Sequence, residues 1–138
     1  RSNYLDIDND PLYPFGYGLS YTTFKYGPLK LDKNTMTEKG SIKASITVTN
    51  TGDYDGDEVV QLYIHDLVAS LSRPVKELKD FVRIHLNKGE SKTVVFTVTP
   101  DQLKFYNSKL EYVCEPGDFD IMVGPNSRDV QTLRFSLQ

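Results

Sequence analysis

Apolar and polar residues alternate along six short stretches of this chain, and this alternation constrains the fold more than any other feature. In each stretch every second residue is apolar, which is the pattern of a β-strand with one buried face and one exposed face. The stretches are 42–48, 60–64, 82–86, 94–98, 119–123 and 133–137. A seventh strand is expected over 24–31, with a bend at Gly27-Pro28.

The residue composition supports the same fold class. The chain holds 12 valines, 6 isoleucines and 11 threonines but only 2 alanines. β-Branched side chains fit a pleated sheet and lose rotamer entropy in a helix. Turn-forming runs such as Asn50-Thr51-Gly52-Asp53 and Asn87-Lys88-Gly89-Glu90 separate the alternating stretches. We therefore predict an all-β fold, an antiparallel sandwich of about seven strands, with one helical turn at 99–103.

Length and charge exclude several classes of protein. The 138 residues, with 38% hydrophobic and 25% charged side chains, suffice for one globular domain. A net charge of −3 lacks the basic footprint of a nucleic-acid-binding protein, and no apolar run approaches the ~20 residues of a membrane-spanning helix. Cys114 is the only cysteine, which rules out an internal disulfide and a cysteine-rich metal site. We expect no cofactor, no nucleic acid and no membrane among the partners.

The first eighteen residues depart from the alternating pattern. Two prolines and two glycines in the run 11–18 prevent a long regular element, yet the segment carries the aromatic side chains of Tyr4, Tyr13, Phe15 and Tyr17. Such an arm needs a surface against which to bury its rings. We therefore divide the chain into an irregular arm or linker, 1–18, and a sandwich domain, 19–138. Because the chain begins with Arg1 rather than Met, we expect a fragment of a larger protein.

Three stretches resemble one known family. The run 11–24, PLYPFGYGLSYTTF, is similar to the segment that joins the last two domains of glycoside hydrolase family 3 enzymes. Two later runs agree in order: 50–63, which begins Asn50-Thr51-Gly52, and 73–81, RPVKELKDF. The resemblance extends over nearly the whole chain. It implies the C-terminal fibronectin type III-like domain of such an enzyme, an immunoglobulin-like sandwich.

The resemblance implies a glycosidase but places its catalytic residues outside this chain. These enzymes, mainly β-glucosidases, hydrolyse terminal β-linked sugars with retention, using two carboxyl groups about 5–5.5 Å apart. Both groups belong to upstream domains, and no residue here matches either motif, so no catalytic residue is assigned. The expected role is to brace the upstream catalytic domains of the same polypeptide, in a secreted or periplasmic enzyme. The candidate domain-interface residues are Tyr13, Phe15, Tyr17 and Tyr21.

Several polar residues invite sharper interpretations that the sequence does not favour. Asp53, Asp55 and Asp57 form an acidic loop with Glu58, which we expect to be solvated, with ordinary pKa values; a loose calcium site there stays open. His65 and His85 fall on the polar faces of their strands, without further ligands to complete a metal site.

Two other functions remain open alternatives to bracing. One is an independent carbohydrate-binding module, in which tyrosine rings stack on sugars; the absence of tryptophan argues against it, and the rings available are Tyr54, Tyr63, Tyr106 and Tyr112. The other is an adhesion or partner-binding domain.

Overall fold

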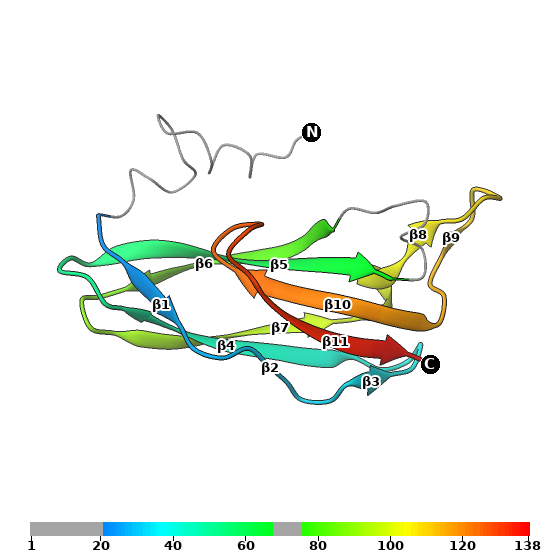
Figure 1. The fold of residues 1–138 in the computed structure, drawn as a ribbon, viewed down its shortest axis with the longest axis horizontal. Helices are drawn as coiled ribbons and strands as arrows, with labels where there is room; N and C mark the ends of the chain where they lie inside the picture. The colour runs from blue at the N-terminus through cyan, green and yellow to red at the C-terminus, as the bar shows by residue number, and fades with distance from the viewer. Residues whose placement is uncertain (1–20, 68–75) are drawn as a thin grey trace.

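Two β-sheets pack face to face in the computed structural model, which describes residues 21–67 and 76–138 (Figure 1). In the first sheet, β4 (Ile42–Asn50) pairs with β7 (Ser91–Val98) on one side. On its other side it pairs with the two short strands β1 (Phe24–Tyr26) and β2 (Lys30–Leu31).

The second sheet has the order β3-β11-β10-β5-β6. Its long strands pair antiparallel, and only the contact of β11 with β3 is parallel. The bounds are β3 Thr35–Met36, β11 Gln131–Leu137, β10 Gly117–Gly124, β5 Gly56–Asp66 and β6 Glu77–Leu86. A separate hairpin, β8 (Phe105–Tyr106) with β9 (Tyr112–Val113), projects from one end.

The predicted sandwich is confirmed, with each of the seven predicted strands present. The first predicted strand is divided at Gly27-Pro28 into β1 and β2, which both pair with β4. Two boundaries were wrong: the strands predicted over 60–64 and 82–86 already begin at Gly56 in β5 and at Glu77 in β6. The helical turn is a 3₁₀ helix, η4 (Pro100–Leu103). Within the described ranges, no helix is long and apolar enough to span a membrane.

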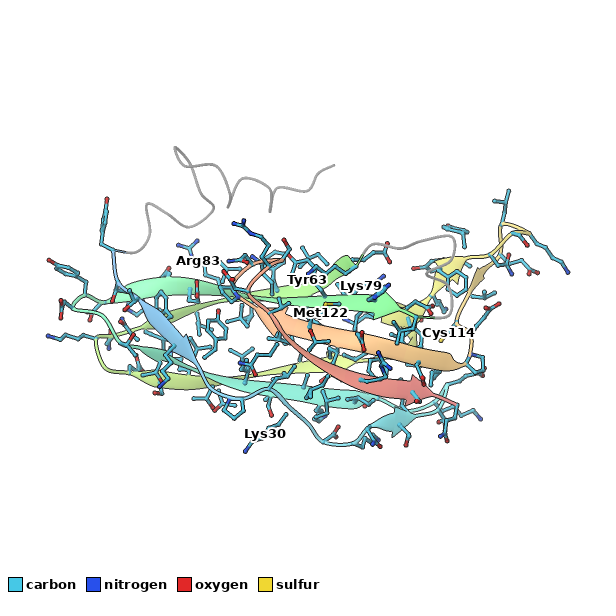
Figure 2. All side chains as sticks on the ribbon, viewed as in Figure 1. Lys30, Tyr63, Lys79, Arg83, Cys114 and Met122 are labelled. Atoms are coloured by element: carbon cyan, nitrogen blue, oxygen red, sulfur yellow. The ribbon has the colours of Figure 1, made fainter. Side chains whose placement is uncertain are left out.

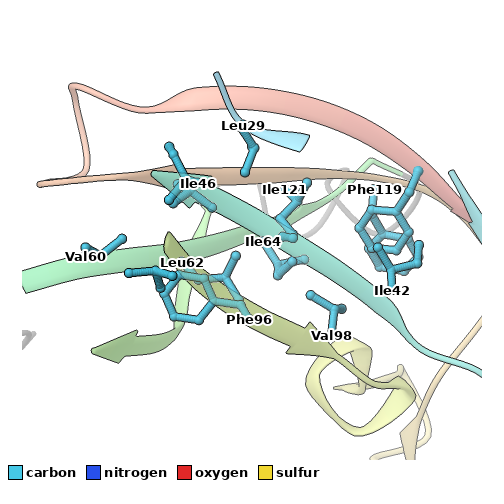
Figure 3. Packing of buried hydrophobic residues seen from close by; sticks show 14 of the residues in the cluster. Leu29, Ile42, Ile46, Val60, Leu62, Ile64, Phe96, Val98, Phe119 and Ile121 are labelled. Carbon is cyan, nitrogen blue, oxygen red and sulfur yellow. The ribbon is translucent and has the colours of Figure 1, made fainter. Parts of the chain in front are cut away.

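The core lies between the inward faces of the two sheets (Figure 3). Alternate residues of each strand supply it, so that in β4 every second residue is buried and the residues between them are exposed or partly exposed. The rings of Phe119 and Phe135 stack at 5.3 Å between centroids. Fully buried members include Ile42, Ile46, Leu62, Leu86, Ile121 and Leu137.

The outer face of the second sheet differs from the prediction. The alternation placed Gln61, Tyr63 and His65 on an exposed polar face, but Gln61 is completely buried and Tyr63 is 3% exposed. Tyr63 packs with Met122 on the adjacent strand (Figure 2). Period-2 alternation shows which residues share a face, but it does not show that both faces of a strand are covered.

Described neighbours account for part of this outer burial. Leu78 and Val130 pack against the Tyr63–Met122 pair, and Lys76 Nζ lies 5.7 Å from the centroid of the Tyr63 ring. The Tyr63 hydroxyl donates a 2.6 Å hydrogen bond to Gln61 Oε1, which helps to satisfy this buried amide.

Candidate domain interface

Three segments distant in sequence meet at one end of the sandwich. They are residues 21–23 before β1, the β4–β5 loop at 50–55 and the β6–β7 turn at 87–90 (Figure 1). We call this region the Asn50 end, because that residue joins all three segments. The β8–β9 hairpin lies at the opposite end of the sandwich.

Asn50 is a buried polar residue, 1% exposed, whose side chain is fully used in hydrogen bonding. Its Nδ2 donates to the carbonyl oxygens of Tyr54 at 2.7 Å and Leu86 at 3.0 Å. Its Oδ1 accepts from the Thr22 hydroxyl at 2.7 Å and from the Gly52 amide at 3.1 Å. A buried network of this kind fixes the relative positions of the loops that it connects.

Backbone contacts reinforce the same junction. The Thr51 amide donates to the Thr23 carbonyl at 2.9 Å, and the Thr23 and Thr51 hydroxyls lie 3.0 Å apart. A Cβ added to Gly52 would lie 1.9 Å from Thr22 Oγ1 and 2.6 Å from the Thr23 amide nitrogen. Glycine is therefore required for steric reasons where the incoming chain crosses the β4–β5 loop.

The Asn50 end presents two large aromatic side chains to solvent. Tyr21 is 77% exposed and Tyr54 is 63% exposed. Of the four predicted interface residues, only Tyr21 can be placed; Tyr13, Phe15 and Tyr17 lie outside the described residues. Tyr54, which we had grouped with the sugar-stacking candidates, shares this end with Tyr21. The Asn50-Thr51-Gly52 run was the sequence signal for this arrangement, but it indicated only a turn.

The acidic residues of this region divide between loop and strand. Asp57 lies in β5, directly across from His85 of β6. Its Oδ1 is 2.6 Å from His85 Nδ1, and its Oδ2 accepts from Arg83 Nε at 2.9 Å. The Asp55 carboxylate accepts the Lys88 amide at 2.7 Å and so braces the β6–β7 turn.

For Asp57, these contacts correct the expectation of an ordinary pKa. The hydrogen bond to His85 lowers the pKa of Asp57, and Arg83 adds to that effect. The same bond to Asp57 raises the pKa of His85, assisted by Asn87. His85 is exposed, as predicted, whereas His65 is only partly exposed, and its buried Nε2 has no hydrogen-bond partner among the residues that the structure describes.

The described residues offer little for catalysis or metal binding. Among them, no group of three or more His, Cys, Asp or Glu side chains could hold a metal ion. A groove of about 400 Å³ between β6 and β7 has Asp80 as the one acidic side chain among its described lining residues, so these do not form a carboxylate pair. The thiol of Cys114 is half-buried beside the core, and burial raises its pKa, which disfavours the reactive thiolate.

The remaining tyrosines do not form one surface. Tyr63 is buried and is thereby excluded from sugar stacking. Tyr106 and Tyr112 face one another across the β8–β9 hairpin, far from Tyr54 at the Asn50 end.

Comparison with known proteins decides the family. The family of fibronectin type III-like domains matches residues 58–127. The chain belongs to this family. Together with the longer relatives described next, this match confirms the resemblance to the C-terminal fibronectin type III-like domain of glycoside hydrolase family 3 enzymes.

The similar proteins are longer glycosidases. A periplasmic β-glucosidase of Salmonella typhimurium is 48% identical over 136 residues, which is 99% of this chain and 18% of the relative. A putative β-xylosidase of Formosa agariphila is 46% identical over 138 residues, which is 100% of this chain and 18% of the relative. The crystal structure of a β-glucosidase from Listeria innocua in complex with glucose matches with a TM-score of 0.80 and 44% identity, over 99% of this chain and 19% of that one. This fibronectin type III-like domain thus spans about a fifth of the length of these relatives.

Proposed function

We propose that this fibronectin type III-like domain is a non-catalytic part of a longer family 3 glycosidase and braces its catalytic domains. The observation that supports this role is the alignment of nearly the whole chain with about a fifth of β-glucosidases and β-xylosidases. The longer enzyme hydrolyses terminal β-linked sugars. The periplasmic relative supports a location outside the cytoplasm, secreted or periplasmic.

The bracing contact is assigned to the Asn50 end. In this proposal residues 1–18 are an arm from the preceding domain, and residues 19–138 form the sandwich. The preceding domain is then tethered next to Tyr21 and Tyr54, whose exposed rings supply apolar contact area. Tyr13, Phe15 and Tyr17 complete the contact, because rings at alternating positions of an extended arm point the same way. The Asn50 network keeps this docking surface rigid, which lowers the entropic cost of association.

The test compares melting temperatures of this chain and of the longer enzyme. Truncating a buried aromatic side chain typically costs about 3–5 kcal/mol. Phe15→Ala should therefore lower the melting temperature of the longer enzyme by several degrees and reduce its activity, while the 138-residue chain loses less. An equal loss in both proteins would assign Phe15 to the sandwich itself and refute the bracing contact.

A second pair of variants locates the contact. Tyr54 and Tyr106 are exposed to nearly the same extent, 63% and 65%, but lie at opposite ends of the domain. Tyr54→Ala should destabilise the longer enzyme and leave the 138-residue chain almost unchanged, whereas Tyr106→Ala should affect neither. If Tyr106→Ala lowers the melting temperature of the longer enzyme more than Tyr54→Ala does, the contact lies at the hairpin end, and its assignment to the Asn50 end is refuted.

A further inference from the structure

The β8–β9 hairpin presents an aromatic pair that the fold itself does not use. Tyr106 and Tyr112 are directly opposite in register, with ring centroids 4.9 Å apart and planes inclined by 40°. Their exposed fractions are 65% and 53%. Phe105 and Val113, paired on the other face of the hairpin, are both half-buried. One face of the hairpin thus packs on the domain, and the aromatic face remains open.

The hairpin is held in one geometry by its own polar contacts. Asn107 Oδ1 accepts the amides of Lys109 at 2.9 Å and Glu111 at 3.0 Å, and its Nδ2 donates to the Glu111 carboxylate at 2.9 Å. Leu110, at the tip, has a φ of 63° and is 81% exposed. The left-handed region is unfavourable for leucine, and such backbone outliers concentrate at functional positions.

We propose that this hairpin binds β-linked oligosaccharides of glucose- or xylose-type sugars by ring stacking. Pyranose rings with all substituents equatorial present only axial C–H groups on both faces, and these faces pack on aromatic rings. Lys104 Nζ already lies 5.8 Å from the centroid of Tyr112, so Tyr106, the more exposed ring, receives the sugar and Tyr112 supports it from the side. Neither tyrosine hydroxyl has a hydrogen-bond partner among the described residues, which leaves both free to bond sugar hydroxyls.

The size of the patch favours a sugar over a protein partner. A stable protein interface buries ~800 Å² on each side. The exposed side chains of Tyr106, Leu110 and Tyr112 offer less than this area, because a fully buried aromatic residue contributes at most about 150–250 Å² and these three are already partly buried. The area suits one or two sugar rings, and the fixed geometry of the hairpin limits the entropy lost on binding. The choice of sugar rests on the proposed function, because the relatives are β-glucosidases and β-xylosidases. The geometry of the site does not depend on that function.

The test is an NMR titration of the 138-residue chain with cellotetraose and with xylotetraose, carried well above the roughly millimolar Kd that one stacking platform provides. Amide shifts confined to residues 104–113 are expected. Tyr106→Ala should weaken binding by about tenfold or more, whereas Tyr106→Phe, which keeps the ring, should change it by no more than about threefold. Tyr54→Ala, which removes an equally exposed ring at the other end, should leave the Kd unchanged.

Three outcomes would overturn this proposal. They are the absence of saturable shifts with either sugar, shifts centred outside the hairpin, and an unchanged Kd for Tyr106→Ala. None of them affects the bracing role, which is judged by melting temperatures in the longer enzyme. If instead Phe15→Ala fails its test while the sugar binds, the bracing proposal falls and the hairpin site stands.

Discussion

The hydroxyl of Thr22 donates a 2.7 Å hydrogen bond to Asn50 Oδ1, a residue 28 positions further along the chain. The same Asn50 side chain reaches the carbonyl of Leu86, so one buried amide connects the beginning of the sandwich to the end of β6. Contacts between residues so distant in sequence form only when the fold is complete. The Asn50 side chain is therefore a central link of the Asn50 end, beside the backbone contacts that reinforce it.

Asn50→Ala should be strongly destabilising. The variant removes the hydrogen bonds of the Asn50 side chain to the carbonyls of Tyr54 and Leu86, to the Gly52 amide and to the Thr22 hydroxyl, and it leaves the buried Leu86 carbonyl without that donor. Unsatisfied buried groups cost about 1–3 kcal/mol each before relaxation, and we expect a total near 3 kcal/mol, or roughly 10 °C in melting temperature. Asn34→Ala, at an exposed asparagine, is the control and should lower the melting temperature by less than about 2 °C. Equal effects of the two variants would refute the central role of Asn50.

Gly52→Ala tests the close approach of the incoming chain to the β4–β5 loop. The new methyl group overlaps Thr22 Oγ1 and the Thr23 amide nitrogen, which is backbone and cannot turn aside. Overpacking of this kind costs about 1–3 kcal/mol. The matched control is Gly40→Ala, where the nearest atoms are 3.5 Å from the added Cβ, an ordinary contact distance. Thermal unfolding of the two variants should show a clear loss for Gly52→Ala alone.

The sequence was sufficient to predict the sandwich because its evidence is local. Each strand carries its own alternation, and Gly27-Pro28 marks the bend between β1 and β2. The Asn50 network could not be predicted in this way. The Asn50-Thr51-Gly52 run is an ordinary turn signal, and its partners Thr22 and Leu86 become neighbours only through the pairing of strands.

The predictions were wrong where the burial or position of a residue depends on other segments of the chain. The residues Gln61 and Tyr63 alternate as an exposed face should, yet both are buried. Part of this burial comes from neighbours on other segments, such as Met122 and Leu78, which pack with Tyr63. Asp57 was assigned to a solvated loop because Gly56 precedes it, but the register of β5 and β6 places it opposite His85. Strand register is a property of two segments together and is not contained in either one.

The Asp57–His85 pair predicts a measurable pH dependence. The hydrogen bond between the His85 imidazole and the Asp57 carboxylate raises the pKa of His85 above the ordinary value of 6.5. An NMR titration of the imidazole protons should therefore give a pKa above that value, and Asp57→Asn should return it toward 6.5. Asp55→Asn is the matched control: the charge of Asp55 raises the pKa of His85 less than Asp57 does, so its removal should shift that pKa much less.

The same pair sets the pH range in which it stabilises the fold. The pKa of Asp57 is lowered from 3.8, so its contribution is present above that pH and is lost as the pH falls through the lowered pKa. The pKa of His85 is raised, so its contribution is complete below about pH 6.5 and is lost as the pH rises through the raised pKa. The difference in melting temperature between the natural chain and Asp57→Asn should thus be greatest between about pH 4 and pH 6.5. It should shrink above that range but not vanish, because Arg83 remains charged and still pairs with Asp57. The difference should be small throughout, since the pair lies at the surface, and should decrease in high salt. A difference that is the same from pH 4 to pH 9 would show that His85 does not take part.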